Sequence, residues 1–375
     1  MIENKFIIFC PDHFNPLGVI RSLGEVGIRP FVILYGHPSI LVKYSKYIEE
    51  MHWSATIADG YRYLQDRFGN ETKKPFLLAT SDDVASYLDL HFNELCDKFY
   101  FFNAGAQGRL THLMEKKNIV EMGWKAGFLV PETEEVARGE MPRKINFPIL
   151  TKSNTPTIHD WKSNVFICRN EAELRNAYEH IDCDRVILQE YVQKVDEINF
   201  EGLSINGGTE VYIPLENRFY RTTSTSFGNY AYIEKIKDQQ LLGKIKELLK
   251  LTKFTGIFEV EFMIGKDGRY YFLEVNFRNS AWLYAYTRCG VNLPLMFAKS
   301  VLANRLVLDD EHIQSLPFKY IDEFTDFKWS VLSGKVNIFK WLRDFFTSDC
   351  TFYINRKDPK PFVMYLINRI KRAVL

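Results

Sequence analysis

The chain has 375 residues and a mass of 44.0 kDa, more than one hydrophobic core usually organises, so we expect two or three domains. Apolar residues make up 46% and charged residues 25% of the sequence, a composition that argues against a globally disordered chain. Lys and Arg number 48 against 47 Asp and Glu, and the resulting net charge of +1 argues against nucleic acid as a partner.

Cysteine usage and hydropathy indicate the cellular compartment. The cysteines are scattered singly without a CxxC pair, which predicts reduced thiols and neither a disulfide framework nor a zinc site. The opening Met-Ile-Glu-Asn-Lys lacks a signal-peptide pattern, and no apolar run reaches the roughly 18 residues of a membrane span. We therefore expect a cytoplasmic protein.

The N-terminal part of the chain alternates strands and helices. Apolar runs at 5–10 and 30–34 suit buried parallel strands, and 17–27 has apolar residues at helical spacing, which together predict a βαβ unit. A further strand at 76–79 leads into Ser-Asp-Asp at 81–83, a typical helix N-cap cluster that is also a candidate amine site. A doubly wound domain follows from this order, and without a GxGxxG motif no dinucleotide is expected.

The rest of the chain mixes helices and strands. In chain order the predicted elements are a helix at 109–126, a strand at 148–151, a helix at 171–181, strands at 185–189 and 198–204, a helix at 238–250 and a hairpin at 257–276. The segment 306–375 is predicted to be mostly helical and ends in a basic stretch.

The hairpin carries the most chemical information. The Asp-Gly pair at 267–268 between two alternating segments predicts a two-residue turn, which places Glu261 opposite Glu274 and Glu259 opposite Asn276. Carboxylates directly across a ladder repel each other, so this face predicts a divalent cation such as Mg²⁺ with an amide oxygen from Asn276. The alternative is a solvated face with pairs to Lys or Arg. The opposite, apolar face is expected to hold Phe258, Val260, Phe262, Leu273 and Val275.

The segment Phe272-Leu-Glu-Val-Asn-Phe-Arg278 resembles the metal motif of the ATP-grasp superfamily, with Phe277 in place of the usual Pro. These proteins are carboxylate–amine or carboxylate–thiol ligases. The resemblance implies that Glu261, Glu274 and Asn276 bind Mg²⁺ or Mn²⁺ and that Arg278 contacts phosphate.

Other segments occur in the order that this family shows. Phe147-Pro-Ile-Leu-Thr-Lys152 resembles the strand whose lysine binds ATP phosphate, and Lys116 resembles a second nucleotide-binding base at a helix start. Leu188-Gln-Glu-Tyr-Val192 resembles the hinge, so Gln189, Glu190, Tyr191 and Val192 are expected to hold adenine and Glu197 the ribose hydroxyls. Taken singly, each has a plainer interpretation as a solvated strand end, surface charge or helix start.

One departure concerns the lid over the phosphates. The family usually has a glycine-rich loop after the position of Lys152, whereas 153–163 contains no glycine. Lys162 is a candidate replacement for that backbone cradle. Such a lid resembles the D-aspartate-ligase-like branch, and the chain is similar to the D-aspartate-ligase-like or carbamoyl-phosphate-synthase-like members of the superfamily.

The resemblance implies an α/β fold of the grasp type: a Rossmann-like pre-ATP-grasp domain at 1–105, grasp lobes at 106–190 and 191–305, and a helical extension at 306–375. It implies an enzyme that uses ATP to activate a carboxylate as an acyl phosphate and joins it to an amine. A non-catalytic ATP-binding module, or a kinase or carboxylating ATPase on the same fold, stays open.

The substrate-facing residues are the least constrained by the sequence. Arg221 and Arg218 are candidate clamps for the substrate carboxylate, because a guanidinium fork suits that geometry. Asn279 and Ser280 follow the metal motif and are candidates to shape the same pocket. The expected partners are small carboxylates and amines, and a homodimer is an option. At 363–375 a basic amphipathic helix is predicted, packed on the body or at an interface, with a peripheral membrane role as the alternative.

Overall fold

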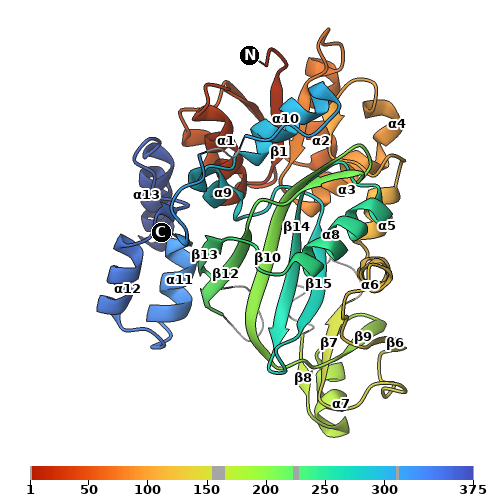
Figure 1. The fold of residues 1–375 in the computed structure, drawn as a ribbon. Helices are drawn as coiled ribbons and strands as arrows, with labels where there is room; N and C mark the ends of the chain where they lie inside the picture. Colours follow the sequence, from red (N-terminus) through yellow and green to blue (C-terminus); the bar gives the residue numbers. More distant parts are fainter. Residues whose placement is uncertain (1, 154–164, 223–227, 310–311, 375) are drawn as a thin grey trace.

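The computed structural model describes residues 2–153, 165–222, 228–309 and 312–374, and within them the chain folds around three sheets (Figure 1). The predicted lid with Lys162 lies outside the described residues. No helix in these ranges is long and apolar enough to cross a membrane.

The N-terminal sheet is parallel, with the order β3-β2-β1-β4-β5. Its strands are β1 (Phe6–Cys10), β2 (Phe31–Tyr35), β3 (Glu50–Ser54), β4 (Phe76–Ala79) and β5 (Tyr100–Phe101). Its helices are α1 (Phe14–Gly24), the 3₁₀ turn η1 (Val42–Tyr44), α2 (Ile57–Phe68), α3 (Asp82–Leu90) and α4 (Phe92–Leu95). Alternate β1 side chains enter cores on opposite faces of the sheet, which confirms the doubly wound arrangement.

The smallest sheet is antiparallel and has the order β6-β9-β7-β8. Its strands are β6 (Thr133–Ala137), β7 (Ile149–Ser153), β8 (Ile167–Cys168) and β9 (Arg185–Glu190). Helix α7 (Glu171–Glu179) covers it through Leu174, Ala177 and Tyr178, which share a small core with Val186 and Leu188. This sheet with its helix forms a lobe at the lower end of the molecule in Figure 1.

The largest sheet has the order β15-β14-β10-β12-β13-β16-β17, with β11 paired to β10. Its strands are β10 (Lys194–Ile205), β11 (Glu210–Tyr212), β12 (Glu216–Arg221), β13 (Tyr230–Glu234), β14 (Gly256–Gly265), β15 (Tyr270–Asn276), β16 (Phe318–Ile321) and β17 (Cys350–Thr351). Helix α8 (Gln239–Thr252) buries Leu241, Ile245, Leu248 and Leu249 in the main core. The last two strands show that the C-terminal segment extends this sheet.

The helix predicted at 109–126 is wrong as a single element. The chain forms α5 (Arg109–Met114) and then α6 (Lys116–Lys125), because Glu115 has an extended backbone with φ −63° and ψ 131°. The break makes Lys116 the first residue of α6. Gly127 follows with φ +81°, as expected for a glycine that ends a helix.

The hairpin turn also differs from the prediction, although the register at the carboxylates is confirmed. The Gly265 N–H donates to the Arg269 carbonyl at 3.0 Å, so the loop has three residues with Gly268 at φ +76°. The register shifts again at Leu273, which restores the pairing of Glu261 with Glu274 and of Glu259 with Asn276. Because of this bulge, Phe272 enters the apolar core in place of the predicted Leu273, which is only half-buried.

The remaining helices join the C-terminal segment to the N-terminal domain. They are α9 (Leu283–Cys289), α10 (Leu293–Ala303), α11 (Glu323–Asp326), a π-helical turn at Phe327–Val331, α12 (Ile338–Phe346) and α13 (Lys360–Val374). Helices α9 and α10 pack on α1. The buried Arg21 guanidinium donates to the Asp358 carboxylate at 3.2 Å and to the Phe352 carbonyl at 2.5 Å, which fastens the C-terminal segment to α1.

Candidate active site

A polar face crosses three neighbouring strands of the large sheet. The antiparallel register pairs Asn199 of β10 with Glu261 of β14, and Glu261 with Glu274 of β15. One step along, Glu201 pairs with Glu259 and Glu259 with Asn276. Since side chains alternate along a strand, these six residues share one side of the sheet. We call them the carboxylate face.

Two amides hold the carboxylates of this face together. Asn276 Nδ2 donates to Glu259 Oε2 at 3.0 Å and to Glu261 Oε1 at 2.7 Å, and Asn199 Nδ2 donates to Glu259 Oε1 at 3.0 Å. Glu261 Oε2 is buried without a hydrogen-bond partner in the described residues. Burial first, and then the nearby Glu259 and Glu274, raise the pKa of Glu261 well above its usual value. An added cation would relieve this crowding.

Two lysines approach the same face from different elements. Lys116, at the start of α6, forms an ion pair with Glu274, and this pair lowers the pKa of the Glu274 carboxyl. Lys152 lies on β7 of the small sheet, where burial and then the neighbouring Lys116 lower its pKa to about 8. Glu274 acts on Lys152 in the opposite direction, which shows that the three groups are close neighbours. Helix α6 and the small sheet therefore each bring a lysine close to one carboxylate.

Arg278 connects the carboxylate face to the N-terminal domain. Its Nε and Nη2 atoms donate to Asp82 Oδ1 and Oδ2 at 2.9 and 3.2 Å, and Nη2 also donates to Asn276 Oδ1 at 3.0 Å. Asn15 Nδ2 donates to the carbonyls of Thr80 and Asn279 at 3.0 and 2.9 Å. The carboxyl ends of β1 and β4 thus meet the end of β15, and Asp82 orients Arg278.

The fit of a metal ion can be judged from these donors. No group of three or more His, Cys, Asp or Glu residues in the described ranges is arranged as a ready metal cluster. Glu261 and Glu274 with the Asn276 amide instead form a two-carboxylate set, which is the number of carboxylates that Mg²⁺ commonly takes when phosphates complete its shell. The partnerless Glu261 oxygen fits a cation, so the residues present suit Mg²⁺.

The predicted hinge residues lie where β9 leaves the small sheet. The Gln189 side chain is buried and donates to Thr133 Oγ1 at 3.1 Å, while Glu190 Oε2 accepts the Glu132 N–H at 3.3 Å. The Tyr191 N–H donates to the Pro148 carbonyl at 3.1 Å, and Val192 is half-buried. This segment joins the two lobes, as the sequence predicts for a hinge.

Glu197, the predicted ribose ligand, begins the polar side of β10. Its buried carboxylate pairs with Lys194 and accepts the Gly228 N–H at 3.0 Å. Burial raises the pKa of Glu197 despite the adjacent Lys194. Side chains at every second position of β10 point to the same side of the sheet. Glu197 therefore shares its side with Asn199 and Glu201 of the carboxylate face, and it lies nearer to the hinge.

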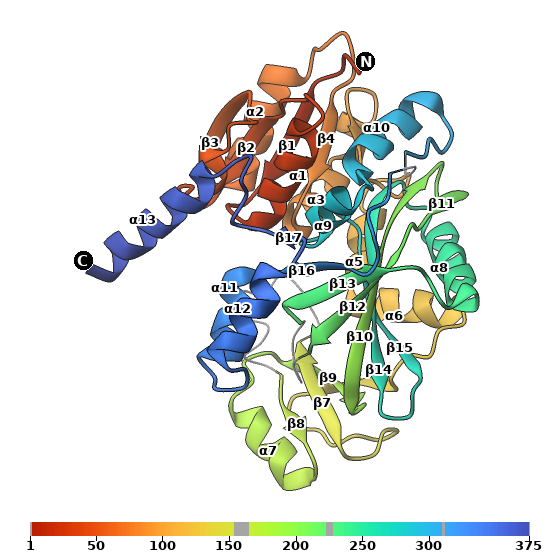
Figure 2. The same cartoon turned by 60° about the vertical axis from the view of Figure 1, so that its left-hand side comes forward.

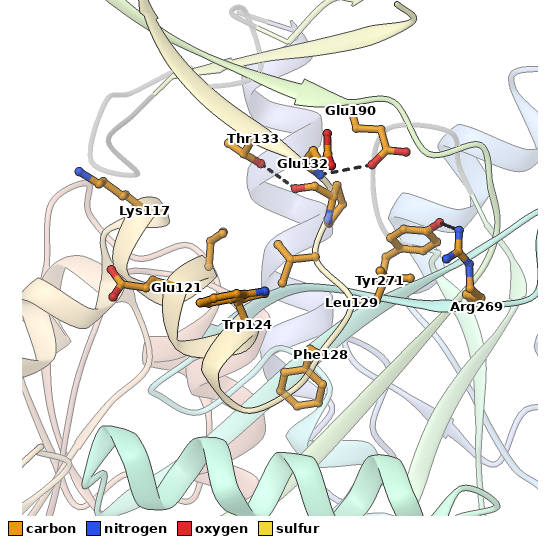
Figure 3. A pocket seen from close by; sticks show the side chains of 13 residues that line it. Lys117, Glu121, Trp124, Phe128, Leu129, Glu132, Thr133, Glu190, Arg269 and Tyr271 are labelled. Carbon is orange, nitrogen blue, oxygen red and sulfur yellow. Dashed lines mark hydrogen bonds between the residues drawn. The ribbon is translucent and has the colours of Figure 1, made fainter. Parts of the chain in front are cut away.

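A cavity of about 640 Å³ opens beside the hinge (Figure 3). Side chains from α6, the loop that follows it, β9 and β15 line it, among them Trp124, Glu190 and Tyr271. Of the residues predicted to hold the nucleotide, Glu190 lines this cavity, whereas Lys116, Lys152 and the carboxylate face do not. The cavity is therefore separate from the phosphate and metal residues.

The two arginines predicted to clamp a substrate carboxylate already have acidic partners. Arg221 Nη2 lies 2.8 Å from Asp344 and 3.5 Å from Asp326, both in the C-terminal segment. Arg218 Nε lies 2.8 Å from Glu216 and 3.1 Å from Glu234. These ion pairs connect neighbouring elements, and the structure does not bring Arg218 or Arg221 into contact with the carboxylate face.

The sequence predicted that Asn279 and Ser280 shape the substrate pocket, whereas Asn199 and Glu201 of the carboxylate face were missed. Ser280 Oγ donates to Glu201 Oε1, and the other oxygen of Glu201 has no partner in the described residues. Further buried polar atoms without a partner there are Thr80 Oγ1, Asn199 Oδ1, Asn217 Nδ2 and Asn279 Oδ1. The every-second-residue polar pattern of β10 was the available signal for Asn199 and Glu201. Unpaired groups at this density indicate a site for water or ligand.

Comparison with known proteins bears on the fold of the chain. No protein-family model matches the chain. N5-carboxyaminoimidazole ribonucleotide synthase of Staphylococcus epidermidis is 23% identical over 172 residues, so the match spans 45% of this chain and 44% of that protein.

Solved structures match over more of the chain. The ADP complex of N5-carboxyaminoimidazole ribonucleotide synthetase superposes with a TM-score of 0.67 at 15% identity, covering 89% of this chain and 85% of that one. Biotin carboxylase from Campylobacter jejuni gives 0.64 at 16%, covering 83% and 74%. The L-amino acid ligase from Bacillus licheniformis gives 0.61 at 12%, covering 80% and 75%.

These likenesses establish the fold. The chain has the ATP-grasp fold, an α/β domain followed by two lobes, with a C-terminal helical region added. This confirms the fold that the metal motif and the order of the other segments implied.

Proposed function

We propose that this chain is an ATP-dependent ligase that activates a small carboxylate as an acyl phosphate and joins it to an amine. The observation that carries the proposal is the convergence of Lys116, Lys152 and Arg278 on the half-buried Glu274 and the buried Glu261, which has a partnerless oxygen. The crowded carboxylates suit a metal cation, and the neighbouring Lys and Arg side chains suit the negative charge of phosphate groups.

Different residues of the site would bind the metal ion, the phosphates and the adenosine during phosphoryl transfer. Glu261, Glu274 and Asn276 would hold Mg²⁺, which neutralises phosphate charge when bound. Lys116 and Lys152 would bind phosphate oxygens, with Lys116 exchanging its contact with Glu274 for the nucleotide. Arg278, held in place by Asp82, would bind the transferred group. The hinge at 189–192 and Glu197 would hold the adenosine.

The proposed reaction has two balanced steps. A carboxylate oxygen attacks the γ-phosphorus of ATP, forming one P–O bond while the bond to ADP breaks. The amine nitrogen then attacks the acyl carbon, phosphate leaves with the electron pair of the C–O bond, and the nitrogen loses a proton. Positioning and neutralisation of spread negative charge are the main requirements, and the three bases provide both.

A carboxylating enzyme is the second candidate. The observation in its favour is the likeness to a biotin carboxylase domain from Hydrogenobacter thermophilus solved with MgADP and bicarbonate, at a TM-score of 0.61. Bicarbonate would then take the place of the organic acid in the first step. A nucleotide-binding module without catalysis is disfavoured, because binding alone does not require a buried, crowded carboxylate such as Glu261 beside Glu274.

The deciding experiment measures ADP and phosphate release with Mg·ATP across a panel of carboxylates, bicarbonate and amines. We expect release with a matched acid and amine, loss on chelation of the metal, and loss in Glu274→Ala. Glu247→Gln on the exposed side of α8 is the matched control and should keep full turnover. Turnover with bicarbonate alone would favour the carboxylating reaction, and tight ATP binding without turnover in any mixture would refute a ligase.

A further inference from the structure

Large apolar side chains project from α12 and the turn before it. Trp329, Leu332, Phe339 and Phe346 are 51%, 70%, 78% and 76% exposed. Phe339 and Phe346 lie seven residues apart, two turns of the helix, and therefore point to the same side. The inner side of α12 is fixed by Trp341, whose Nε1 donates to buried Asp326 at 2.8 Å. Rotation of α12 about its axis therefore cannot hide the two phenylalanines without breaking this contact.

Helix α13 has a second apolar stripe. Val363, Ile367 and Ile370 recur at helical spacing and are exposed, Ile370 by 63%. The other side of the helix packs inward, with Phe362 and Tyr365 contacting the Phe324 ring at centroid distances of 6.1 and 5.3 Å. The inward side of the helix thus anchors it to the body, and the exposed stripe takes no part in this packing.

Lys and Arg outnumber acidic residues on both helices, and the one acid of α12, Asp344, is buried. Between 327 and 343 the bases are Lys328, Lys335, Lys340 and Arg343, and that segment contains no Asp or Glu. Between 359 and 371 the bases are Lys360, Arg369 and Lys371, again without an acid. The net charge of the whole chain, +1, does not reveal this local excess of Lys and Arg. Together the exposed apolar side chains and these bases define the α12–α13 face.

The two helices lie on the same flank of the molecule in both views. Figure 1 shows α12 below α13 at one edge, and Figure 2 shows α13 running outward from the N-terminal domain with α12 beneath it. The carboxylate face belongs to strands β10, β14 and β15, which stand apart from this flank. A surface bound here would leave the carboxylate face uncovered.

We propose that the α12–α13 face docks on a membrane surface that contains anionic lipid. Exposed aromatic and aliphatic side chains beside Lys and Arg are the composition of helices that lie in the plane of an interface, where the apolar groups enter the acyl boundary and the bases meet lipid phosphates. A second copy of the chain fits less well, because a two-fold interface would place this cationic face against itself. The inference is independent of the proposed reaction.

The test is co-sedimentation of the full chain with vesicles of phosphatidylcholine and phosphatidylglycerol, compared with phosphatidylcholine alone. We expect binding to the anionic vesicles that weakens in high salt. The pair Phe339→Ser with Phe346→Ser should lower the partition coefficient at least about tenfold, because two large apolar side chains leave the insertion surface. Lys335→Glu with Lys340→Glu should lower it on anionic vesicles by a similar factor. Leu302→Ser, an exposed apolar site on α10, is the matched control and should bind as the original chain does.

Three results would overturn the proposal, provided that the variants are folded. Circular dichroism spectra and unfolding midpoints equal to those of the original chain confirm that the variants are folded. Equal binding to neutral and anionic vesicles would contradict the role of the bases. Absence of vesicle binding, together with a dimer in sedimentation that the Phe339 and Phe346 variant dissociates, would assign the face to a second copy. Binding of all variants alike would place the membrane contact elsewhere.

Discussion

At the scale of single residues, Glu261 shows how the site differs from an ordinary part of the core. It is buried, it shares Asn276 with Glu259, and one of its oxygens has no partner in the described residues. A buried carboxylate of this kind costs folding free energy unless a cation or proton joins it. Such a cost is typical of residues kept for function.

Glu261→Gln tests this interpretation. The amide has nearly the same size, so we expect the free energy of unfolding to stay the same or rise by about 1 kcal/mol, while ATP turnover falls by about 100-fold or more. Chemical denaturation and ADP release measure the two effects, with Glu247→Gln as control. A variant that lost stability but kept turnover would make Glu261 a structural residue.

Lys152 predicts a pH dependence of nucleotide binding. Its pKa is lowered to about 8, so the free protein loses this ammonium as the pH rises through that value. Phosphate binds the protonated form, and the apparent dissociation constant for ATP should rise roughly tenfold between pH 7 and 9. Titration calorimetry measures it. In Lys152→Arg, which stays charged, the rise should disappear, and its persistence would assign the titration to another group.

At the scale of elements, the sequence predicted the metal hairpin's register but not its turn. The register is confirmed because the buried face leaves few ways to pair alternating polar and apolar residues. The three-residue loop and the bulge at Leu273 were missed, because their two one-residue shifts cancel at Glu261 and Glu274 and leave no trace in the alternation. The break at Glu115 was missed because apolar periodicity continues across it, while the backbone turns to place Lys116.

The packing of α6 on β15 gives a prediction for that placement. A Cβ on Gly123 would lie 2.5 Å from the Phe272 ring, so Gly123→Ala should move α6 away from β15 and Lys116 away from Glu274. We expect a loss of about 1–3 kcal/mol of stability and weaker ATP binding. Gly243→Ala on α8, with nothing within 4 Å, is the matched control and should stabilise by about 0.5–1 kcal/mol. Equal effects of the two substitutions would contradict the close contact.

At the scale of the whole molecule, the alternation of strands and helices predicted the N-terminal α/β domain, whereas the two lobes and the helical C-terminal region were implied by the resemblance to the ATP-grasp superfamily. How the parts join depends on contacts between distant residues. Asp82 to Arg278, Arg221 to Asp344 and Arg21 to Asp358 all connect segments far apart in the chain. Part of the aromatic surplus lies at such junctions, where Trp282, Tyr320 and Phe352 pack together.

The Arg21–Asp358 ion pair predicts how the C-terminal segment is held. Both side chains are buried, and Asp358 also accepts bonds from Ser45 Oγ and the Lys46 N–H. Asp358→Ala leaves Arg21 buried without its counter-ion and should cost about 3–5 kcal/mol. Urea unfolding measures the loss, and limited proteolysis should cleave ahead of α13. Asp309→Ala, at an exposed ion pair, should leave the unfolding midpoint unchanged. An unfolding free energy of Asp358→Ala equal to that of the original chain would show that other contacts hold the C-terminal segment.

The central claim is that a carboxylate is activated by phosphoryl transfer at the carboxylate face. The most direct test supplies the acid with both carboxylate oxygens replaced by a heavy isotope, together with Mg·ATP and the matched amine, and analyses the released phosphate by mass spectrometry. An acyl phosphate requires that each phosphate carry one labelled oxygen from the acid. Unlabelled phosphate, formed at the same rate as the amide, would contradict the account.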